Sequence, residues 1–337
     1  SPTVNVKNVS GRGHYVFIMR TNVPPFDNNH LRLALKYAIN RVEMVDKILD
    51  GYGGIGNDTP INAAYPLFDD SLPQREFSVE EAAKHYKASG HDGSPIELIV
   101  ADTAFPGAVD AAALFQQSAQ AAGIPLTIKR VPNDGYWSDV WNVMPFSASY
   151  WGGRPVQDQM YSTAYLSTAD WNDTAFNNPE FDALILKARG ETDLVKRKAY
   201  YAELARILHD TGGVIVPMFN DFVEAISDNL QGWVANPNQE LMDGNVSHVT
   251  WLADLYRHAD SAGGCGAKHS GAVCDPPEPC EPACRTRVGC PGPHALSQLA
   301  RRRVAGRSGQ GPDQWSGHLY RHRQASRQHP VSGKCRG

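Results

Sequence analysis

Apolar residues recur at helical spacing between residues 31 and 49, which is the most regular pattern in the chain. They share one face of a helix: Leu31, Leu35, Ala38, Ile39, Val42, Val45, Ile48 and Leu49. Such a stripe predicts one amphipathic helix over residues 31–49 with its apolar face on a core. Asn28 or Asn29 can cap its start, and Gly51 can end it.

Residues 96–131 show the pattern of a strand, a helix and a strand. Residues 96–100 and 126–131 are short, largely apolar segments, and the alanine-rich helix 108–122 between them ends at Gly123. Two strands joined by a crossover helix form a βαβ unit, in which the strands are parallel and helices cover the sheet. We therefore predict an α/β fold with a mixed, largely parallel sheet.

Three further helices have recognisable starts. Ser78 and Glu81 form the capping-box pattern before a helix that stops at residue 90. Asn178 precedes Pro179, which suits the first position of a second helix. A third is predicted over residues 193–209.

Two other segments have the composition of strands. Residues 15–19 (Tyr-Val-Phe-Ile-Met) are continuously apolar and predict a buried strand. Residues 214–219 predict another strand, which contains Pro217. Proline cannot donate a hydrogen bond, so we expect this strand at an edge or rim of the sheet.

Composition divides the 337 residues into two unlike parts. Residues 255–337 hold 13 of the 32 Lys and Arg residues but only 5 of the 36 Asp and Glu residues, a net charge of +8, whereas residues 1–254 carry −12. All six cysteines lie in this basic tail, which contains no Ile, Phe or Met. The length suits about two domains, and no apolar run reaches the roughly 18 residues that span a bilayer.

Residues 146–155 combine a short strand with side chains suited to a ligand. The strand ends in Tyr150 and Trp151, large rings that each have a polar edge. Gly152 and Gly153 let the backbone turn sharply or approach another group closely. Further aromatic residues lie nearby in sequence: Tyr136, Trp137, Trp141, Tyr161 and Tyr165. The cluster is interpreted either as core packing or as the lining of a binding pocket.

Arg154 follows the two glycines and carries a planar guanidinium suited to a carboxylate. Two interpretations are open from the residues alone. Either Arg154 faces a ligand, or it pairs with Asp158 in an ordinary loop.

The order of motifs over residues 15–254 resembles that of the family 5 extracellular solute-binding proteins, which deliver peptides and related solutes to bacterial ABC importers. The matching segments are Asn22-Val23-Pro24-Pro25-Phe26-Asp27, residues 31–41, residues 80–90, Trp151, Asn178-Pro179-Glu180-Phe181-Asp182 and Val216-Pro217-Met218-Phe219. Trp151-Gly152-Gly153-Arg154-Pro155 with Trp171-Asn172-Asp173 resembles a distinct branch of that family.

The resemblance implies a periplasmic-binding-protein type II-like lobe from a protein of two lobes around a cleft. We expect residues 1–24 to be a remnant of lobe I with a crossing strand, 25–225 to be lobe II, and 226–254 to return to lobe I. The chain is then the C-terminal half of a binding protein, which binds ligand weakly or not at all alone and exposes apolar surface where lobe I packs.

The implied partners are a peptide or other small-molecule ligand and the permease subunits of an ABC transporter. No cofactor and no nucleic acid is expected, and contact with a membrane occurs only through the permease. The implied location is periplasmic, or extracellular with a lipid anchor. We expect the signal peptide of such a protein to lie outside this chain.

The resemblance also indicates a ligand site. In peptide-binding members, the strand that ends in the matching tryptophan is followed closely by an aspartate for the ligand's amino terminus, whereas here Arg154 stands there and the first acid is Asp158. Charge complementarity therefore favours a carboxylate-bearing solute. The candidate ligand-binding residues are Tyr150, Trp151, Gly152, Gly153, Arg154, Asp158, Trp141 and Asn172.

Catalysis has little support in the sequence. No nucleophile-elbow, HExxH or P-loop pattern occurs. His85, His91 and His209 lie near predicted helix C-termini, where the helix dipole already favours histidine. We therefore expect a binding protein and not an enzyme, with no catalytic or metal-ligating residues.

The tail at 255–337 allows three interpretations. The first is a disulfide framework or zinc module, but the cysteines lack a C-x-x-C pair, which disfavours zinc. The second is a basic nucleic-acid arm, but the arginine clusters lack interleaved aromatic residues. We favour the third interpretation, a disordered segment translated in a wrong reading frame. The alternative function for the whole chain is a secreted interaction or scaffold protein that uses this cysteine-rich tail.

Overall fold

The computed structural model describes residues 4–238 and 250–251. Its helices are α1 (Asn29–Tyr37), α2 (Arg41–Ile48), α3 (Val79–Ser89), α4 (Ala108–Ala121), α5 (Gln157–Ala164), α6 (Pro179–Gly190) and α7 (Leu194–Thr211), with a π-helical turn η1 (Tyr136–Val140). Its strands are β1 (Val4–Met19), β2 (Gly53–Ile55), β3 (Ile96–Val100), β4 (Leu126–Arg130), β5 (Phe146–Trp151), β6 (Val214–Ser227), β7 (Leu230–Gln231) and β8 (Thr250–Trp251). The predicted tail at 255–337 lies outside the described residues.

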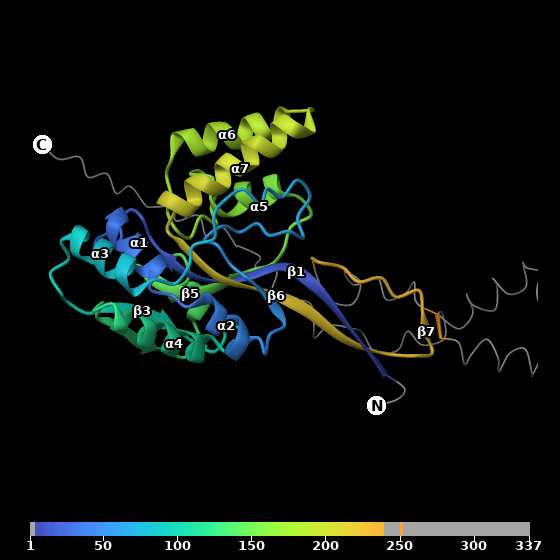
Figure 1. The fold of residues 1–337 in the computed structure, drawn as a ribbon, viewed down its shortest axis with the longest axis horizontal. Helices are drawn as coiled ribbons and strands as arrows, with labels where there is room; N and C mark the ends of the chain where they lie inside the picture. Colours follow the sequence, from blue (N-terminus) through green and yellow to red (C-terminus); the bar gives the residue numbers. More distant parts are fainter. Residues whose placement is uncertain (1–3, 239–249, 252–337) are drawn as a thin grey trace, which may run out of the picture. The chain divides into compact units, whose positions relative to one another are not determined.

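Six strands form one mixed sheet in the order β2-β6-β1-β5-β3-β4 (Figure 1). The predicted βαβ unit is confirmed, because β3 pairs in parallel with both β4 and β5. The long strand β1 is antiparallel to β5 and β6, and β6 is antiparallel to β2. The α/β class and the mixed sheet are therefore confirmed, but the parallel part is limited to three strands because β1 and β6 cross the sheet in opposite directions.

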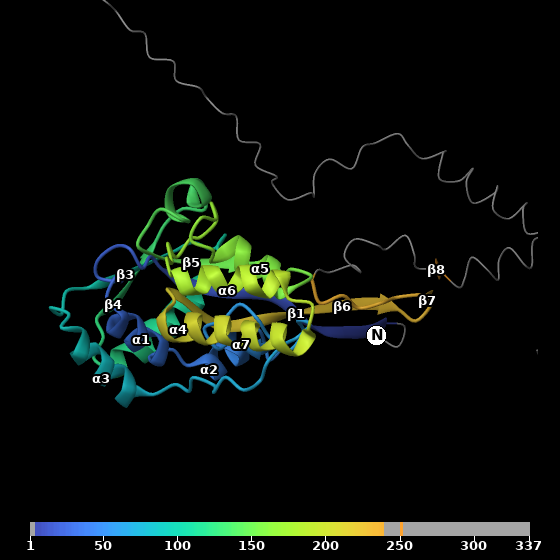
Figure 2. The same ribbon diagram turned by 90° about the horizontal axis from the view of Figure 1, so that it is seen from above.

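Helices cover both faces of this sheet (Figures 1 and 2). Alternate residues of β1 show the arrangement: Phe17 and Met19 enter the core under α1 to α4, whereas Val16 and Ile18 enter the core under α5 to α7. A strand that is buried on both faces has apolar side chains at successive positions. This burial explains the unbroken apolar run at residues 15–19.

The prediction of a single helix over residues 31–49 is wrong, because the chain forms two helices there. Asn28 caps α1, as expected, and Asn40 accepts a hydrogen bond from the Glu43 backbone N–H at 3.2 Å to begin α2. Both helices pack on the same core, so the apolar spacing runs on through the break. Val42 was placed on the buried face but is 59% exposed.

Pro217 lies inside the sheet and not in an edge strand, because β2 and β1 flank β6. The register between β1 and β6 shifts between the pairs Tyr15–Met218 and Phe17–Ile215. Pro217 therefore occupies a β-bulge, the other position in a sheet that tolerates a missing N–H.

The outer halves of β1 and β6 run beyond the helices as a two-stranded ribbon (Figures 1 and 2). Val4 pairs with Ser227 at one end of the ribbon and Ser10 with Asp221 at the other. Val6 is 63% exposed and Val223 is 45% exposed, so the ribbon presents apolar side chains to solvent.

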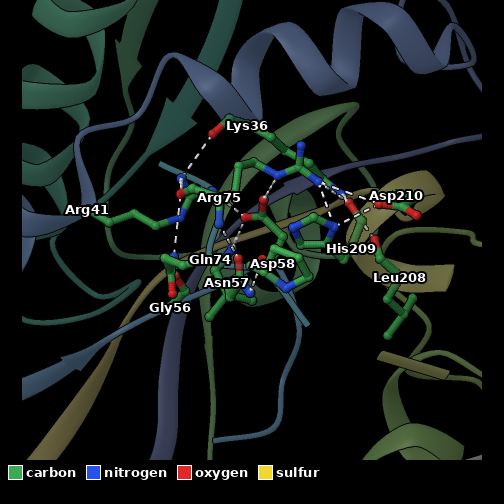
Figure 3. A network of polar contacts seen from close by, with 12 residues as sticks. Lys36, Arg41, Gly56, Asn57, Asp58, Gln74, Arg75, Leu208, His209 and Asp210 are labelled. Carbon is green, nitrogen blue, oxygen red and sulfur yellow. Dashed lines mark hydrogen bonds and ion pairs between the residues drawn. The ribbon is translucent and has the colours of Figure 1, made fainter. Parts of the chain in front are cut away.

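A buried ionic network joins α1, α2, α7 and β6 around Asp58 (Figure 3). One Asp58 oxygen accepts from Arg41 Nη2 at 2.7 Å and from the Val216 backbone N–H at 3.1 Å, and the other accepts from Arg75 Nε at 3.0 Å. Lys36 Nζ donates to the backbone carbonyls of Leu208 and His209 near the end of α7. The network fixes the loop 56–75 between the helices of both layers.

Within the described residues, no helix combines the length and apolar character that crossing a membrane requires.

Candidate functional site

The strand β5 ends at the carboxyl edge of the parallel part of the sheet, which is where α/β proteins commonly bind ligands. Its last two residues point to opposite faces. Tyr150 is 51% exposed, whereas Trp151 is 5% exposed and packs in the core under α5 to α7. The predicted place of both rings at the end of a strand is therefore confirmed, but only Tyr150 is open to solvent.

Five rings continue from one face of the sheet to the other around this strand end, and we call them the aromatic row: Tyr150, Trp137, Trp141, Trp171 and Trp151. Trp137 contacts Tyr150 at 5.6 Å between ring centroids and Trp141 at 6.4 Å. Trp171 contacts both Trp141 and Trp151 at 6.2 Å. Trp171 is 52% exposed, so the row presents aromatic surface at Tyr150 and at Trp171, while Trp151 is buried.

Trp171 is carried by a loop that Asn172 holds together. The Asn172 amide donates to the carbonyls of Leu166 and Phe176, while its oxygen accepts from the Phe176 N–H and from the Thr174 hydroxyl. Asn172 is buried and its amide is fully used in these contacts. The structure therefore gives this candidate ligand-binding residue a supporting position behind the row.

Asp173 is the residue of this site that the sequence interpretation missed. It is 1% exposed, and its Oδ2 accepts a hydrogen bond from Trp141 Nε1 at 3.0 Å. Burial raises the pKa of Asp173 to about 7, against the opposing effect of the Trp141 and Trp151 indoles. The only signal was its place after Trp171 and Asn172 in the quoted motif.

The turn after β5 is built by close backbone approach. A Cβ on Gly153 would lie 2.7 Å from the Arg12 Cβ, so the close approach expected of these glycines occurs at Gly153, whereas a Cβ on Gly152 would make only an ordinary contact with Arg154 Nη1 at 3.8 Å. The Arg154 backbone N–H donates to the Tyr65 hydroxyl at 3.1 Å, and Arg154 Nη1 donates to the carbonyls of Gly152 and Gly153 at 3.0 Å. The Arg154 side chain is half-buried over its own turn.

The pairing of Arg154 with Asp158 that a simple loop would show is wrong. Asp158 lies in α5, a helix that we did not predict, and its carboxylate pairs with Arg189 Nε of α6 at 3.1 Å. The helix points Asp158 toward α6, so it serves the packing of these two helices. Arg154 itself forms no ion pair with any residue in 4–238.

The candidate site contains rings, one buried carboxyl and one guanidinium, which is a set suited to binding. In the part of the chain that the structure describes, no group of three or more His, Cys, Asp or Glu side chains could hold a metal ion. A surface of this composition can stack flat apolar groups and pair with an anion.

Known proteins with similar sequences and folds bind solutes. Residues 1–173 match the family model described as bacterial extracellular solute-binding proteins, family 5 Middle. Heme-binding protein A of Haemophilus influenzae is 21% identical over 248 residues, which are 70% of this chain and 44% of that protein.

Solved structures agree on the fold. The ABC transporter substrate-binding protein CtaP of Listeria monocytogenes matches with a TM-score of 0.65 and 22% identity, over 74% of this chain and 52% of that one. The oligopeptide-binding protein AppA of Bacillus subtilis, in complex with a nonapeptide, matches with a TM-score of 0.62 and 17% identity, over 74% and 52%.

These matches define the class of fold first: an α/β portion like that of the solved substrate-binding proteins. Because the family model covers more than half of the residues, the chain belongs to the family 5 bacterial extracellular solute-binding proteins. The chain spans about half the length of the relatives it matches.

Proposed function

We propose that this protein captures a peptide or a related carboxylate-bearing small solute between two lobes and presents it to the permease subunits of an ABC importer. The observation that carries the proposal is the aromatic row, which lies at the carboxyl edge of the parallel strands in a chain of this family. Closure of two lobes around a ligand is driven by the contacts that the ligand makes only in the closed state.

Three features of the described residues support this role. The exposed rings of Tyr150 and Trp171 offer apolar surface to a ligand, and Arg154 has no carboxylate partner among residues 4–238. The ribbon of β1 and β6 exposes Val6 and Val223, which suits packing against a further part of the binding protein. Residues 25–225 then act as lobe II. The place of action is outside the cytoplasmic membrane, periplasmic or lipid-anchored.

The row of rings also favours a second ligand class, a flat apolar molecule. Tryptophan faces stack on planar ring systems, and the relative from Haemophilus influenzae bears the name of a heme-binding protein. Hemin is therefore a second probe beside peptides.

The test is a titration of the purified chain with short peptides that have free or amidated carboxyl termini, and with hemin, followed by tryptophan fluorescence. We expect Arg154→Ala to weaken binding of the free-carboxylate peptides by roughly 1.5–3 kcal/mol and to leave the amidated peptides unchanged. Lys187→Ala, on the outer part of α6, is the matched control. Equal affinity of wild type and Arg154→Ala for the free peptides would overturn the role of Arg154.

A further inference from the structure

One buried carboxyl group adjoins three tryptophans of the aromatic row. Trp141 Nε1 donates to Asp173 Oδ2 at 3.0 Å. Trp171 precedes Asp173 by two residues, and its carbonyl accepts from the Asp173 backbone N–H at 2.8 Å. The ring of Trp151 contacts that of Trp171 at 6.2 Å between centroids, and its indole acts to lower the pKa of Asp173.

The other atoms around this carboxyl are incompletely satisfied. Asp173 Oδ1, Trp151 Nε1 and the Tyr165 hydroxyl are all buried, and none has a hydrogen-bond partner among residues 4–238. Buried polar atoms are nearly always paired, so three unpaired atoms in one place mark a feature that needs a reason. The charge of Arg20, which directly follows β1, also acts on the carboxyl.

We propose that Asp173 is a positioning residue whose buried carboxyl holds the indole of Trp141 and, when ionised, takes up that of Trp151 as well, so that the aromatic row presents a fixed surface to the ligand. The two indoles come from different elements, one directly after η1 and the other from the end of β5. Trp171 lies against both of their rings. We call this arrangement of Asp173 with the two indoles the clamp. The use of the aromatic row for a ligand rests on the proposed function, whereas the clamp itself does not.

The protonation state of Asp173 decides how many indoles it can hold. An ionised carboxylate accepts on both oxygens, so it can take one N–H from Trp141 and one from Trp151. A protonated carboxyl turns one oxygen into a donor, which can then serve the Tyr165 hydroxyl and is a weaker acceptor for an indole than an ionised oxygen. Loss of the proton therefore draws Trp151 toward Asp173 and tightens the row.

The electrostatics place this change near neutral pH. Desolvation raises the pKa of Asp173 to about 7, and the indoles of Trp141 and Trp151 and the charge of Arg20 act against it. The same carboxyl contributes to the raised pKa of Tyr165, after burial itself. Tyr165 therefore stays neutral and available as the acceptor of a carboxyl proton.

The experiment follows the indole N–H resonances of the ¹⁵N-labelled full chain by NMR between pH 5 and pH 9. Trp141→Phe and Trp151→Phe assign the two resonances by their disappearance. We expect both to shift with a midpoint near pH 7 in the wild type, and neither to titrate there in Asp173→Asn. Asp170→Asn, an exposed aspartate of the same loop, should leave both titrations unchanged.

Titration of both indoles that persists in Asp173→Asn would overturn the proposal, as would indoles that do not titrate in the wild type. If Asp173→Asn does not fold, Trp141→Phe decides: removal of one donor to the carboxylate should move the Trp151 midpoint to higher pH, and an unmoved midpoint refutes the clamp.

A second readout connects the clamp to the ligand. The free-carboxylate peptides used above should bind Asp173→Asn at least about fivefold more weakly than wild type at pH 8 and with a smaller difference at pH 5, and equal ratios at both pH values would contradict a positioning role. The NMR result stands whether or not any peptide binds, so a failure of the clamp is distinguished from a failure of the proposed function.

Discussion

Asp58 and Asp173 are both buried aspartates, 0% and 1% exposed, yet their surroundings act on them in opposite directions. Burial alone raises the pKa of either carboxyl. At Asp58 the nearby charges of Arg41, Lys36 and Arg75 together outweigh burial and hold the pKa below its ordinary value. At Asp173 two neutral indoles and the charge of Arg20 do not outweigh it, and the pKa rises to about 7.

The difference teaches that hydrogen-bond pairing, and not burial, separates a structural carboxyl from one that can change its protonation state. Both Asp58 oxygens accept hydrogen bonds, one from each of two guanidinium groups and a third from a backbone N–H. The carboxylate is therefore fixed in its ionised state. Asp173 keeps one oxygen without a partner among the described residues. A fully paired network rigidifies a core, whereas a partly paired one has more than one available arrangement.

The largest effect on stability is expected from breaking the buried ionic network around Asp58. Asp58→Ala leaves the guanidinium groups of Arg41 and Arg75 buried without a counter-charge, and we expect a loss of about 3–5 kcal/mol in the free energy of unfolding. Chemical denaturation measures it. A loss below about 1 kcal/mol would show that Arg41 and Arg75 find water or other acceptors.

Asp173→Asn should remove a pH dependence of stability, whereas Asp58→Ala removes stability itself. The folded pKa is raised, so the wild type binds this proton more tightly when folded, and its stability falls as the pH rises from about 4 to the folded value of about 7. The amide lacks this dependence. We expect the variant to gain about 2–3 kcal/mol relative to wild type between pH 5 and pH 8. Unfolding curves at the two pH values test it, and a constant difference contradicts the raised pKa.

Trp171→Ala tests whether the row binds ligand rather than only packing. Because the ring is half-exposed, its removal should cost little stability but weaken peptide or hemin binding by roughly 1–2 kcal/mol, about tenfold. Fluorescence titration of a probe ligand provides the affinity. Val195→Ala, an apolar residue on α7 that is 80% exposed, is the control and should bind as wild type does.

The smallest effect is expected from an aspartate paired on the surface. Asp102 pairs with Arg130 at 2.6 Å, but both side chains are more than half exposed, so Asp102→Ala should change the free energy of unfolding by no more than about 1 kcal/mol. Set beside Asp58→Ala in the same denaturation assay, it separates the effect of burial from that of pairing. A loss as large as that of Asp58→Ala would show that pairing alone matters.

Local signals in the sequence predicted most of the elements. The Ser78 hydroxyl accepts from the Glu81 N–H at 3.1 Å, as the capping pattern requires, and Asn178 caps α6 with Pro179 at its first position. Such interactions lie within a few residues, so the sequence displays both partners. The break between α1 and α2 was missed because one core covers both helices and keeps a single apolar period across the break.

The sequence by itself determined the helices with clear caps, the βαβ unit, the position of Tyr150 and Trp151 at a strand end, and the family resemblance. Only the tertiary structure decided which partners the charged side chains take. Arg189, and not Arg154, pairs with Asp158 across α5 and α6, and Trp141 reaches Asp173 from 32 residues away. The physical reason is that a salt bridge or a shared hydrogen bond depends on how separate elements pack, and no local periodicity records that packing.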